Sequence, residues 1–374
     1  MIRRGAIKVV RMIAIVLLVT LGTTLLLELV PGDVASSVLG EGATAEQYEA
    51  LREELRLDQS IPSRYGDWLG GAVTGDFGKS IVPPVTEVGS LISARLPVTI
   101  EIAVLAMLLS LFAAIPLAMW TAYRAGGAGD KLVSGFAFGA ISVPSFLSAL
   151  LVIFFVIFHP GATKALIAAV GVMVVASIVV GWIKADRRPH SRRAWARSAA
   201  AAVAVVVLTV LVVWQFPAFP RQGFVRITEG GLASNLRSAF LPALTLALLE
   251  ASVYLRVLRA DLITTLDEDF VLSAEAKGLP AWRVMARHAL RPSSLSLVTV
   301  AGVGFARLLG GTIIVEAVFN VRGMGDLIVN AIQTKDYPVV QAGVAVLAVV
   351  FVVMNALVDV TYTYLDPRIR ARHV

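Results

Sequence analysis

Five ionisable residues stand inside long apolar stretches, where an unpaired charge costs enough free energy to need a reason. They are Glu28, Glu101, Glu250, Arg307 and Asp359. Glu28, Glu101 and Asp359 fall near the ends of their stretches, where snorkelling to the interface or helix capping accounts for them. Glu250 and Arg307 lie deeper, so we predict that they face the interior of a helix bundle and line or gate a translocation path. The alternative is a structural ion pair or a charge shielded by another subunit.

The patterns that carry covalent or metal chemistry are missing from the sequence. There is no cysteine, and the four histidines are too far apart to form a metal site: His159, His190, His288 and His373. Gly78-Lys79-Ser80 is part of a phosphate-loop pattern, but valine occupies position 73, where that loop needs a glycine. There is no serine-hydrolase elbow and no dinucleotide fingerprint. We therefore predict that the chain is not an enzyme, has no catalytic residue and holds no metal or cofactor of its own.

A polar island at 267–292 separates two long apolar segments. Acidic residues at its start suit a helix N-terminus, Gly278 can supply a left-handed helix stop, and Pro280 stands where a second helix would begin. This order predicts a helix, a turn and a second helix. The small residues Ala274, Ala276 and Gly278 leave the turn bare enough for another protein to approach closely. The alternative is an ordinary amphipathic connector.

The run Ala-Glu-Ala-Lys-Gly-Leu at 274–279 and the run Arg-His-Ala-Leu-Arg-Pro at 287–292 resemble a known element. It is the coupling loop of the membrane subunits of binding-protein-dependent ABC importers, in the dipeptide, oligopeptide and nickel branch. We assign the coupling loop to 259–293, and the resemblance implies that a cytoplasmic ATPase grips it. Leu272 stands where the general motif has a glutamate, so that role is not carried over. The candidate ATPase-coupling residues are Ala274, Glu275, Ala276, Lys277, Gly278, Leu279, Arg287 and Leu290.

Other segments resemble the same branch in the same order along the chain. Among them are Gly75-Asp76-Phe77-Gly78, the run from Val315 to Phe319 with Arg322-Gly323-Met324-Gly325, and the ending Asp366-Pro367-Arg368. The resemblance covers most of the chain apart from 159–213, which looks like an inserted transmembrane hairpin. Its basic loop at 184–197 predicts a cytoplasmic position, with contact to anionic lipid headgroups as an open second role.

Composition independently defines the broad class. Apolar residues make up 57% of the chain and charged residues 16%, which is too little polar surface for a soluble globule of 374 residues. The net charge of +7 comes from basic residues clustered in short loops between apolar segments, which fits membrane topology better than nucleic-acid binding. The sequence therefore predicts an integral membrane protein.

We predict an all-α polytopic helical bundle of about eight spans, in which a six-span importer core carries the inserted hairpin. The predicted spans are 12–30, 96–123, 132–158, 164–183, 199–216, 240–258, 294–319 and 339–365. As regions, these give a first span in 1–32, an extracytoplasmic helical segment at 33–95, spans 96–158, the hairpin at 159–213 and the remaining core at 214–374 with its coupling loop. The basic lead and apolar run at the N-terminus also fit a signal peptide, but the run is longer than a usual signal core.

Details within these regions give further expectations. Acidic residues outnumber basic ones in 33–95, which favours the outer face, and Lys and Arg are more frequent in the segments assigned to the inside. Both termini are therefore expected in the cytoplasm. Thr44 should precede one short helix and Pro62 should open another, while Pro144 should kink the third span. Gly302, Ala306 and Gly310 recur at four-residue spacing, which predicts close helix packing, either with a second membrane subunit or within the chain.

Together, the resemblance implies a permease subunit in the bacterial inner membrane that imports peptides or similar small solutes. The expected partners are a second homologous permease, two cytoplasmic ATP-binding subunits that hold ATP and Mg, an extracytoplasmic substrate-binding protein and membrane lipid, but no nucleic acid. Nickel chelates or glutathione are alternative cargoes. Two other classes remain open: a secondary transporter, which would need no ATPase, and a membrane anchor, for which the coupling loop would be a docking site only.

Overall fold

The computed structural model describes residues 2–29, 44–54, 58–185, 192–214, 219–220 and 222–365 of the chain. This part is built from α-helices, with short π-helical segments, and its residues Lys79 and Glu87 form one isolated antiparallel bridge. The elements, in order, are α1 (Ile2–Glu28), α3 (Ala45–Glu54), α4 (Ile61–Thr74), α5 (Val88–Tyr123), α6 (Ala128–Ser142), α7 (Ser145–Val152), η1 (Ile153–Phe158), α8 (Pro160–Ala185), α9 (Arg192–Trp214), α10 (Ile227–Leu266), α11 (Asp269–Ala276), α12 (Ala281–Arg283), η2 (Val284–Ala289), α13 (Leu290–Phe319), α14 (Met324–Gln333) and α15 (Tyr337–Leu365).

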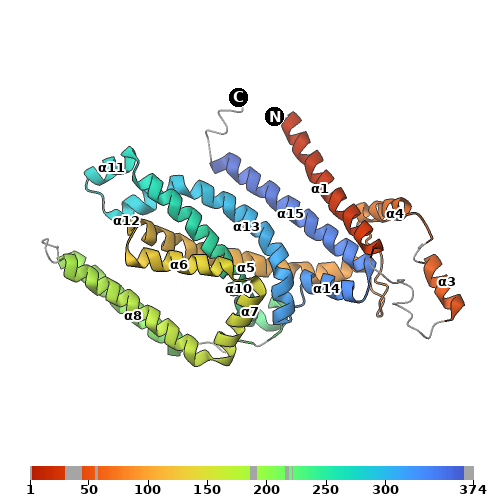
Figure 1. Ribbon diagram of the computed structural model, residues 1–374, viewed down its shortest axis with the longest axis horizontal. Coiled ribbons are helices and arrows are strands. Elements are labelled where there is room, and N and C mark those ends of the chain that lie inside the picture. Colours follow the sequence, from red (N-terminus) through yellow and green to blue (C-terminus); the bar gives the residue numbers. More distant parts are fainter. Residues whose placement is uncertain are drawn as a thin grey trace. The chain divides into compact units, whose positions relative to one another are not determined.

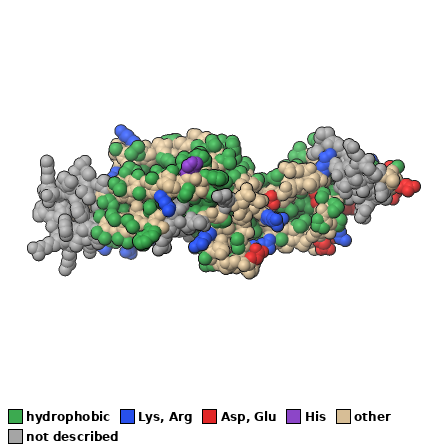
Figure 2. Space-filling view, turned by 90° about the horizontal axis from the view of Figure 1, so that it is seen from below, with side chains coloured by type: hydrophobic (Ala, Val, Ile, Leu, Met, Phe, Trp, Pro, Cys, Tyr) green, Lys and Arg blue, Asp and Glu red, His purple; other side chains and the backbone are tan. Residues whose placement is uncertain are grey.

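Long apolar helices confirm the predicted class of all-α polytopic membrane protein. Within the described residues, five helices are long and apolar enough to cross a membrane, and the broken helix of α6 with α7 and η1 makes a sixth if it counts as one span. Helices α8 and α9 correspond to the two spans of the predicted hairpin. Hydrophobic side chains cover much of the face seen in Figure 2, with few charges between them.

Local signals set several of the helix ends. Pro62 lies in the first turn of α4, and Gly75 ends that helix in the left-handed conformation, with φ of 89°. Helix α3 begins directly after Thr44. The chain leaves helical geometry at Val143, next to Pro144, and α7 resumes at Ser145, so the predicted kink is confirmed.

Two helices continue beyond the predicted spans, because tertiary packing extends them. Helix α5 begins at Val88 rather than next to Pro97, since Val88 and Ile92 are buried in a cluster with residues of α14 and α15. Pro97 is therefore inside the helix. Helix α10 runs on to Leu266, eight residues beyond the predicted end, and buries Leu262 in the core. A membrane helix can extend beyond its apolar stretch wherever neighbouring elements cover the added turns.

The chain divides into two compact units, one formed by 1–146 with 222–374 and the other by Leu147–Arg221. The smaller unit contains the predicted insertion, and its helices α8 and α9 pack against each other. They approach closely at Gly171, where a side chain would overlap Thr209. Residues 186–191, at the centre of the predicted basic loop, lie outside the described residues.

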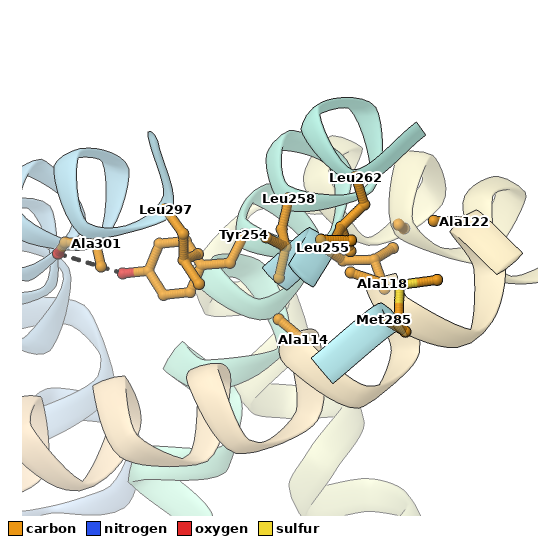
Figure 3. Close-up of a cluster of buried hydrophobic side chains, with 12 residues drawn as sticks. Ala114, Ala118, Ala122, Tyr254, Leu255, Leu258, Leu262, Met285, Leu297 and Ala301 are labelled. Atoms are coloured by element: carbon orange, nitrogen blue, oxygen red, sulfur yellow. Dashed lines mark hydrogen bonds between the residues drawn. The ribbon is translucent and has the colours of Figure 1, made fainter. Parts of the chain in front are cut away.

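In the larger unit, α10 packs against α5 and α13, and α1 runs beside α15 (Figure 1). One face of α5 carries small buried residues at helical spacing: Ala103, Ala106, Ser110, Ala114, Ala118 and Ala122. Leucines of α10 lie against the last three alanines, and Met285 of η2 joins the same cluster (Figure 3). Because lipid tails are as apolar as leucine, such small residues favour association by allowing backbones to approach. This packing fixes the base of the coupling loop.

Candidate functional site

The coupling loop contains the predicted helix, turn and helix. Helix α11 ends at Ala276, and Gly278 follows with φ of 75°, the left-handed conformation that favours glycine. The amide of Gly278 donates to the carbonyl of Glu275 at 2.8 Å, which closes the end of α11. Pro280 directly precedes α12, and η2 continues toward α13. A side chain at Gly278 would meet no atom within 4 Å, so the turn is open.

The candidate coupling residues divide into an exposed and a covered group. Glu275, Ala276, Lys277, Gly278 and Arg287 are exposed. Ala274 is buried against Val271 and Val284, which corrects the expectation that it bares the turn for another protein. Its small side chain instead lets α11 pack against η2. Leu279 is partly buried in the same cluster, and Leu290 packs on the α5–α10 core.

Three large apolar side chains on the coupling loop are solvent-exposed, and sequence reasoning did not single them out as a surface. Phe270 is 48% exposed, Leu272 53% and Trp282 66%. The guanidinium of Arg283 lies 5.4 Å from the centre of the Trp282 ring. Exposed apolar groups of this size at a connection between spans indicate a surface that another protein covers.

An ion pair joins the start of the coupling loop to the first turn of α6. The guanidinium of Arg259 donates to both carboxylate oxygens of Asp130, at 2.6 and 2.7 Å. The Asp130 side chain is 5% exposed and that of Arg259 26% exposed. The amide of Gly126 donates to the same carboxylate at 2.9 Å. A bidentate pair of this kind fixes orientation as well as distance, so the start of the coupling loop is held rigidly to α6.

Glu250 of α10 and Arg307 of α13 form the second candidate site. An Nη atom of Arg307 donates to a carboxylate oxygen of Glu250 at 3.0 Å, with the Glu250 side chain 4% exposed and that of Arg307 52% exposed. The two side chains therefore form an ion pair. Glu250 faces the bundle interior as expected, but Arg307 does not, because half of its side chain is uncovered.

The chain matches two family models that together span most of its length. Residues 114–371 match the binding-protein-dependent transport system inner membrane component, and residues 1–103 match the N-terminal part of the corresponding membrane components. The chain belongs to this family of inner membrane transport components. It is thus a multi-pass inner-membrane subunit that works with other components of an ABC transport complex.

Curated relatives cover almost the whole chain. A Brucella abortus protein whose name describes a peptide transport system permease is 32% identical over 365 residues, with 97% of each chain covered. A Sinorhizobium fredii protein whose name describes a peptide ABC transporter permease is 30% identical, with the same coverage. The dipeptide transport system permease of Escherichia coli is 30% identical over 97% of this chain and 98% of its own.

The other charged residues predicted near span ends in this transport component occupy different surroundings. Glu28 pairs with Arg64 of α4 beside a cavity of about 220 Å³, and burial lowers the pKa of the Arg64 guanidinium. Glu101 is partly exposed. The side chain of Asp359 lies outside the described residues. For Glu28, an ion pair to a neighbouring helix replaces the predicted snorkelling.

Glu316 is a buried charged residue that the sequence analysis did not single out among the intramembrane charges. Its side chain is fully buried and accepts hydrogen bonds from the Thr99 hydroxyl at 2.6 Å and from the amides of Gly325 and Asp326 at 2.8 and 3.1 Å. Side chains at Gly323 or Gly325 would overlap the carboxylate. Gly323 and Gly325, which follow Glu316 near the end of a span, were the feature of the sequence that could have indicated a buried carboxylate. Glu316 caps α14 and joins it to α13 and α5.

The three small residues of α13 that were predicted to pack closely, Gly302, Ala306 and Gly310, are not all on a free surface. A side chain at Gly302 would overlap Val358 of α15, and Ala306 is buried. Gly310 is open, with no atom within 4 Å of an added Cβ. Gly302 therefore supports packing within the chain.

In the part of the chain that the structure describes, no group of three His, Asp or Glu side chains could hold a metal ion.

Proposed function

We propose that this chain is a permease subunit of an ABC importer that carries peptides across the bacterial inner membrane. The names of its relatives supply the substrate class, since the similarity runs over nearly the full length of both chains. In this proposal the chain hydrolyses no ATP and carries no cofactor. A second homologous permease completes the path, two cytoplasmic ATPases hold ATP and Mg, and an extracytoplasmic binding protein delivers the cargo. Both termini lie in the cytoplasm.

The observation that carries the proposal is the exposed apolar surface of the coupling loop. The open turn at Gly278 is next to the exposed charges of Glu275 and Lys277, and the same loop exposes Arg287, Phe270 and Trp282. An ATPase surface that covered the apolar groups and paired the charges would bury both kinds of contact at once. Because Arg259 ties the loop to α6 and Met285 ties it to the core, movement of the loop would reach the spans.

Co-purification in mild detergent tests this docking role. Wild type and the variants Gly278→Asp and Gly75→Asp would be expressed with the remaining components of the transporter and isolated through a tag on this chain. Gly75 is a matched control, because it also has a positive φ with no atom within 4 Å of an added Cβ, but it lies in the external segment. We expect an ATPase pair with wild type and Gly75→Asp, and its loss with Gly278→Asp. A wild-type chain that purifies stably without an ATPase would overturn the proposal.

Uptake assays test the cargo. Cells that lack this subunit would be supplied with labelled dipeptides and oligopeptides, a nickel chelate or glutathione, with and without the restored gene. We expect restored, ATP-dependent peptide uptake. Restoration of nickel or glutathione uptake alone would move the chain to the corresponding alternative cargo, and uptake without any ATPase would indicate a secondary transporter.

A further inference from the structure

One face of α13 remains uncovered by the residues that the structure describes. Its exposed residues recur every three or four positions, which places them in one stripe: Val303, Arg307, Gly310, Ile314 and Ala317. Arg307 is the single charged residue of this stripe. It lies twelve residues before the helix end at Phe319, which corresponds to about 18 Å along the axis at 1.5 Å per residue. Half of a bilayer's hydrocarbon core is about 15 Å thick, so Arg307 lies deep in the membrane.

This stripe does not suit a lipid environment. Intramembrane arginines usually face a bundle interior or a water-filled cavity, because hydrocarbon solvates a guanidinium poorly. On α5, by comparison, the exposed residues from Val104 to Phe112 on one face are Val104, Leu108 and Phe112, the kind of residue that lipid tails favour. The uncovered face of α13 therefore points to water or to another protein in the assembled transporter.

Glu250 holds Arg307 in a fixed but incomplete arrangement. The buried Tyr254 packs beside Glu250, and a side chain at Gly304 would lie 2.3 Å from the Tyr254 hydroxyl and 2.7 Å from the Glu250 carboxylate. Glu250 is therefore confined. Within the described residues, Arg307 makes one hydrogen bond, to Glu250. A guanidinium has five N–H donors, so most of its donors are not used by this bond. The exposed half of Arg307 retains donors for a ligand.

The remaining donors match a carboxylate. A guanidinium binds two carboxylate oxygens in parallel, and this geometry distinguishes arginine from lysine. Because Glu250 already neutralises much of the arginine charge, a second carboxylate would bind weakly enough to leave, as a transport path requires. We propose that Arg307 receives the C-terminal carboxylate of a peptide in the middle of the membrane, with Glu250 as its positioning residue. This inference rests on the proposed peptide transport.

The absence of cysteine from the chain allows a direct test of this environment. In the assembled importer in proteoliposomes, an Arg307→Cys variant would be treated with water-soluble aminoethyl methanethiosulfonate, with labelling read on this chain by mass. Leu108→Cys on this exposed face of α5 and Leu308→Cys in the core are the controls, since Leu108 is 57% exposed and Leu308 2% exposed. We expect labelling at position 307 and little at the control positions. Labelling in the free subunit but not in the complex would show that another subunit covers Arg307, which would overturn the proposal.

Substrate protection tests the carboxylate itself. A peptide with a free C-terminus should slow the labelling of Arg307→Cys in the complex, and the same peptide with an amidated C-terminus should not. Protection by both forms alike would contradict carboxylate recognition. Uptake by Arg307→Cys should fall about tenfold or more, as expected for loss of a charged hydrogen bond, and return in part when the reagent restores a cation. Unchanged uptake would also overturn the proposal.

The positioning role of Glu250 requires a separate readout. Glu250→Gln keeps the shape of the side chain but removes the charge that orients Arg307. We expect KM for peptide uptake to change more than kcat, and Arg307→Lys to retain part of the uptake. Equal losses of both parameters together with poor assembly would assign Glu250 a structural role only. If wild type shows no ATP-dependent peptide uptake, the proposed function fails; if it does and Arg307→Cys behaves like wild type, only this inference fails.

Discussion

The two connections that flank α13 differ in how much apolar surface they leave exposed. At one end lies the α14 corner, residues 320–336, where Val321 and Met324 are fully buried. At the other end lie the coupling-loop helices α11 and α12 (Figure 1). They expose Phe270, Leu272 and Trp282. The α14 corner exposes one large apolar side chain, Ile332, which is 53% exposed, whereas the coupling loop exposes three. This difference supports the proposal that an ATPase docks on the coupling loop.

Hydrogen bonding shows the same contrast. In the α14 corner the Thr99 hydroxyl donates to Glu316 and accepts from the amide of Met324 at 2.8 Å. Asp336 accepts from the Ser80 hydroxyl and from the amide of Ile81. Donors at the start of α14 thus reach a buried acceptor. The coupling loop contacts the neighbouring spans near its base, through residues such as Arg259, Leu262 and Met285.

The largest expected effect is loss of the Glu316 carboxylate. Glu316→Ala removes the acceptor of two buried amides and of the Thr99 hydroxyl, so the free energy of unfolding should fall by about 3 kcal/mol or more. Thermal unfolding of the detergent-purified subunit measures this change. Glu101→Gln, which alters a partly exposed carboxylate of α5, should behave like wild type. Equal stability of Glu316→Ala and wild type would show that the α14 corner does not depend on its buried carboxylate.

A smaller effect is expected where the coupling loop joins α6, and it should depend on which partner is removed. Arg259→Ala leaves the Asp130 carboxylate buried and should cost about 2 to 3 kcal/mol, whereas Asp130→Asn leaves a guanidinium that is already 26% exposed and should cost less. Chemical or thermal unfolding of both variants in detergent would compare them. If Asp130→Asn proved the more damaging, the hydrogen bonds of Asp130 to Gly126 and Ser134 would dominate instead of the ion pair.

Local chemistry explains what could be predicted from the sequence. The turn at Gly278, the helix that Pro62 opens and the break at Pro144 depend on the restricted backbone of glycine and proline, which is readable without tertiary contacts. The pairing of Glu250 with Arg307 was also predictable, because two isolated charges deep in apolar segments need partners. Span existence followed from length and apolar content alone.

Long-range contacts explain what the sequence did not reveal. Asp130 and Arg259 are far apart in the chain, and neither stands in a pattern that names its partner. The small side chain of Ala274 predicted an exposed position open to another protein, but Ala274 is buried against Val284 across the turn. The alanine face of α5 has regular spacing, yet alanine is too common in membrane helices for that spacing to attract notice. Exposure of Trp282 depends on how η2 packs, which local periodicity does not determine.

The smallest effect on the subunit itself is expected at the exposed apolar side chains of the coupling loop. Trp282→Ala and Leu272→Ala remove groups that are 66% and 53% exposed, so each should change the free energy of unfolding by less than about 0.5 kcal/mol. The same variants should lose ATPase during co-purification, because aromatic and apolar anchors dominate protein interfaces. Trp214→Ala, in which an 82% exposed tryptophan of α9 is removed, is the matched control and should retain the ATPase. Retention of the ATPase by both Trp282→Ala and Leu272→Ala would show that these apolar side chains do not anchor the ATPase. The docking contacts would then have to come from exposed charged residues of the loop such as Glu275 and Lys277.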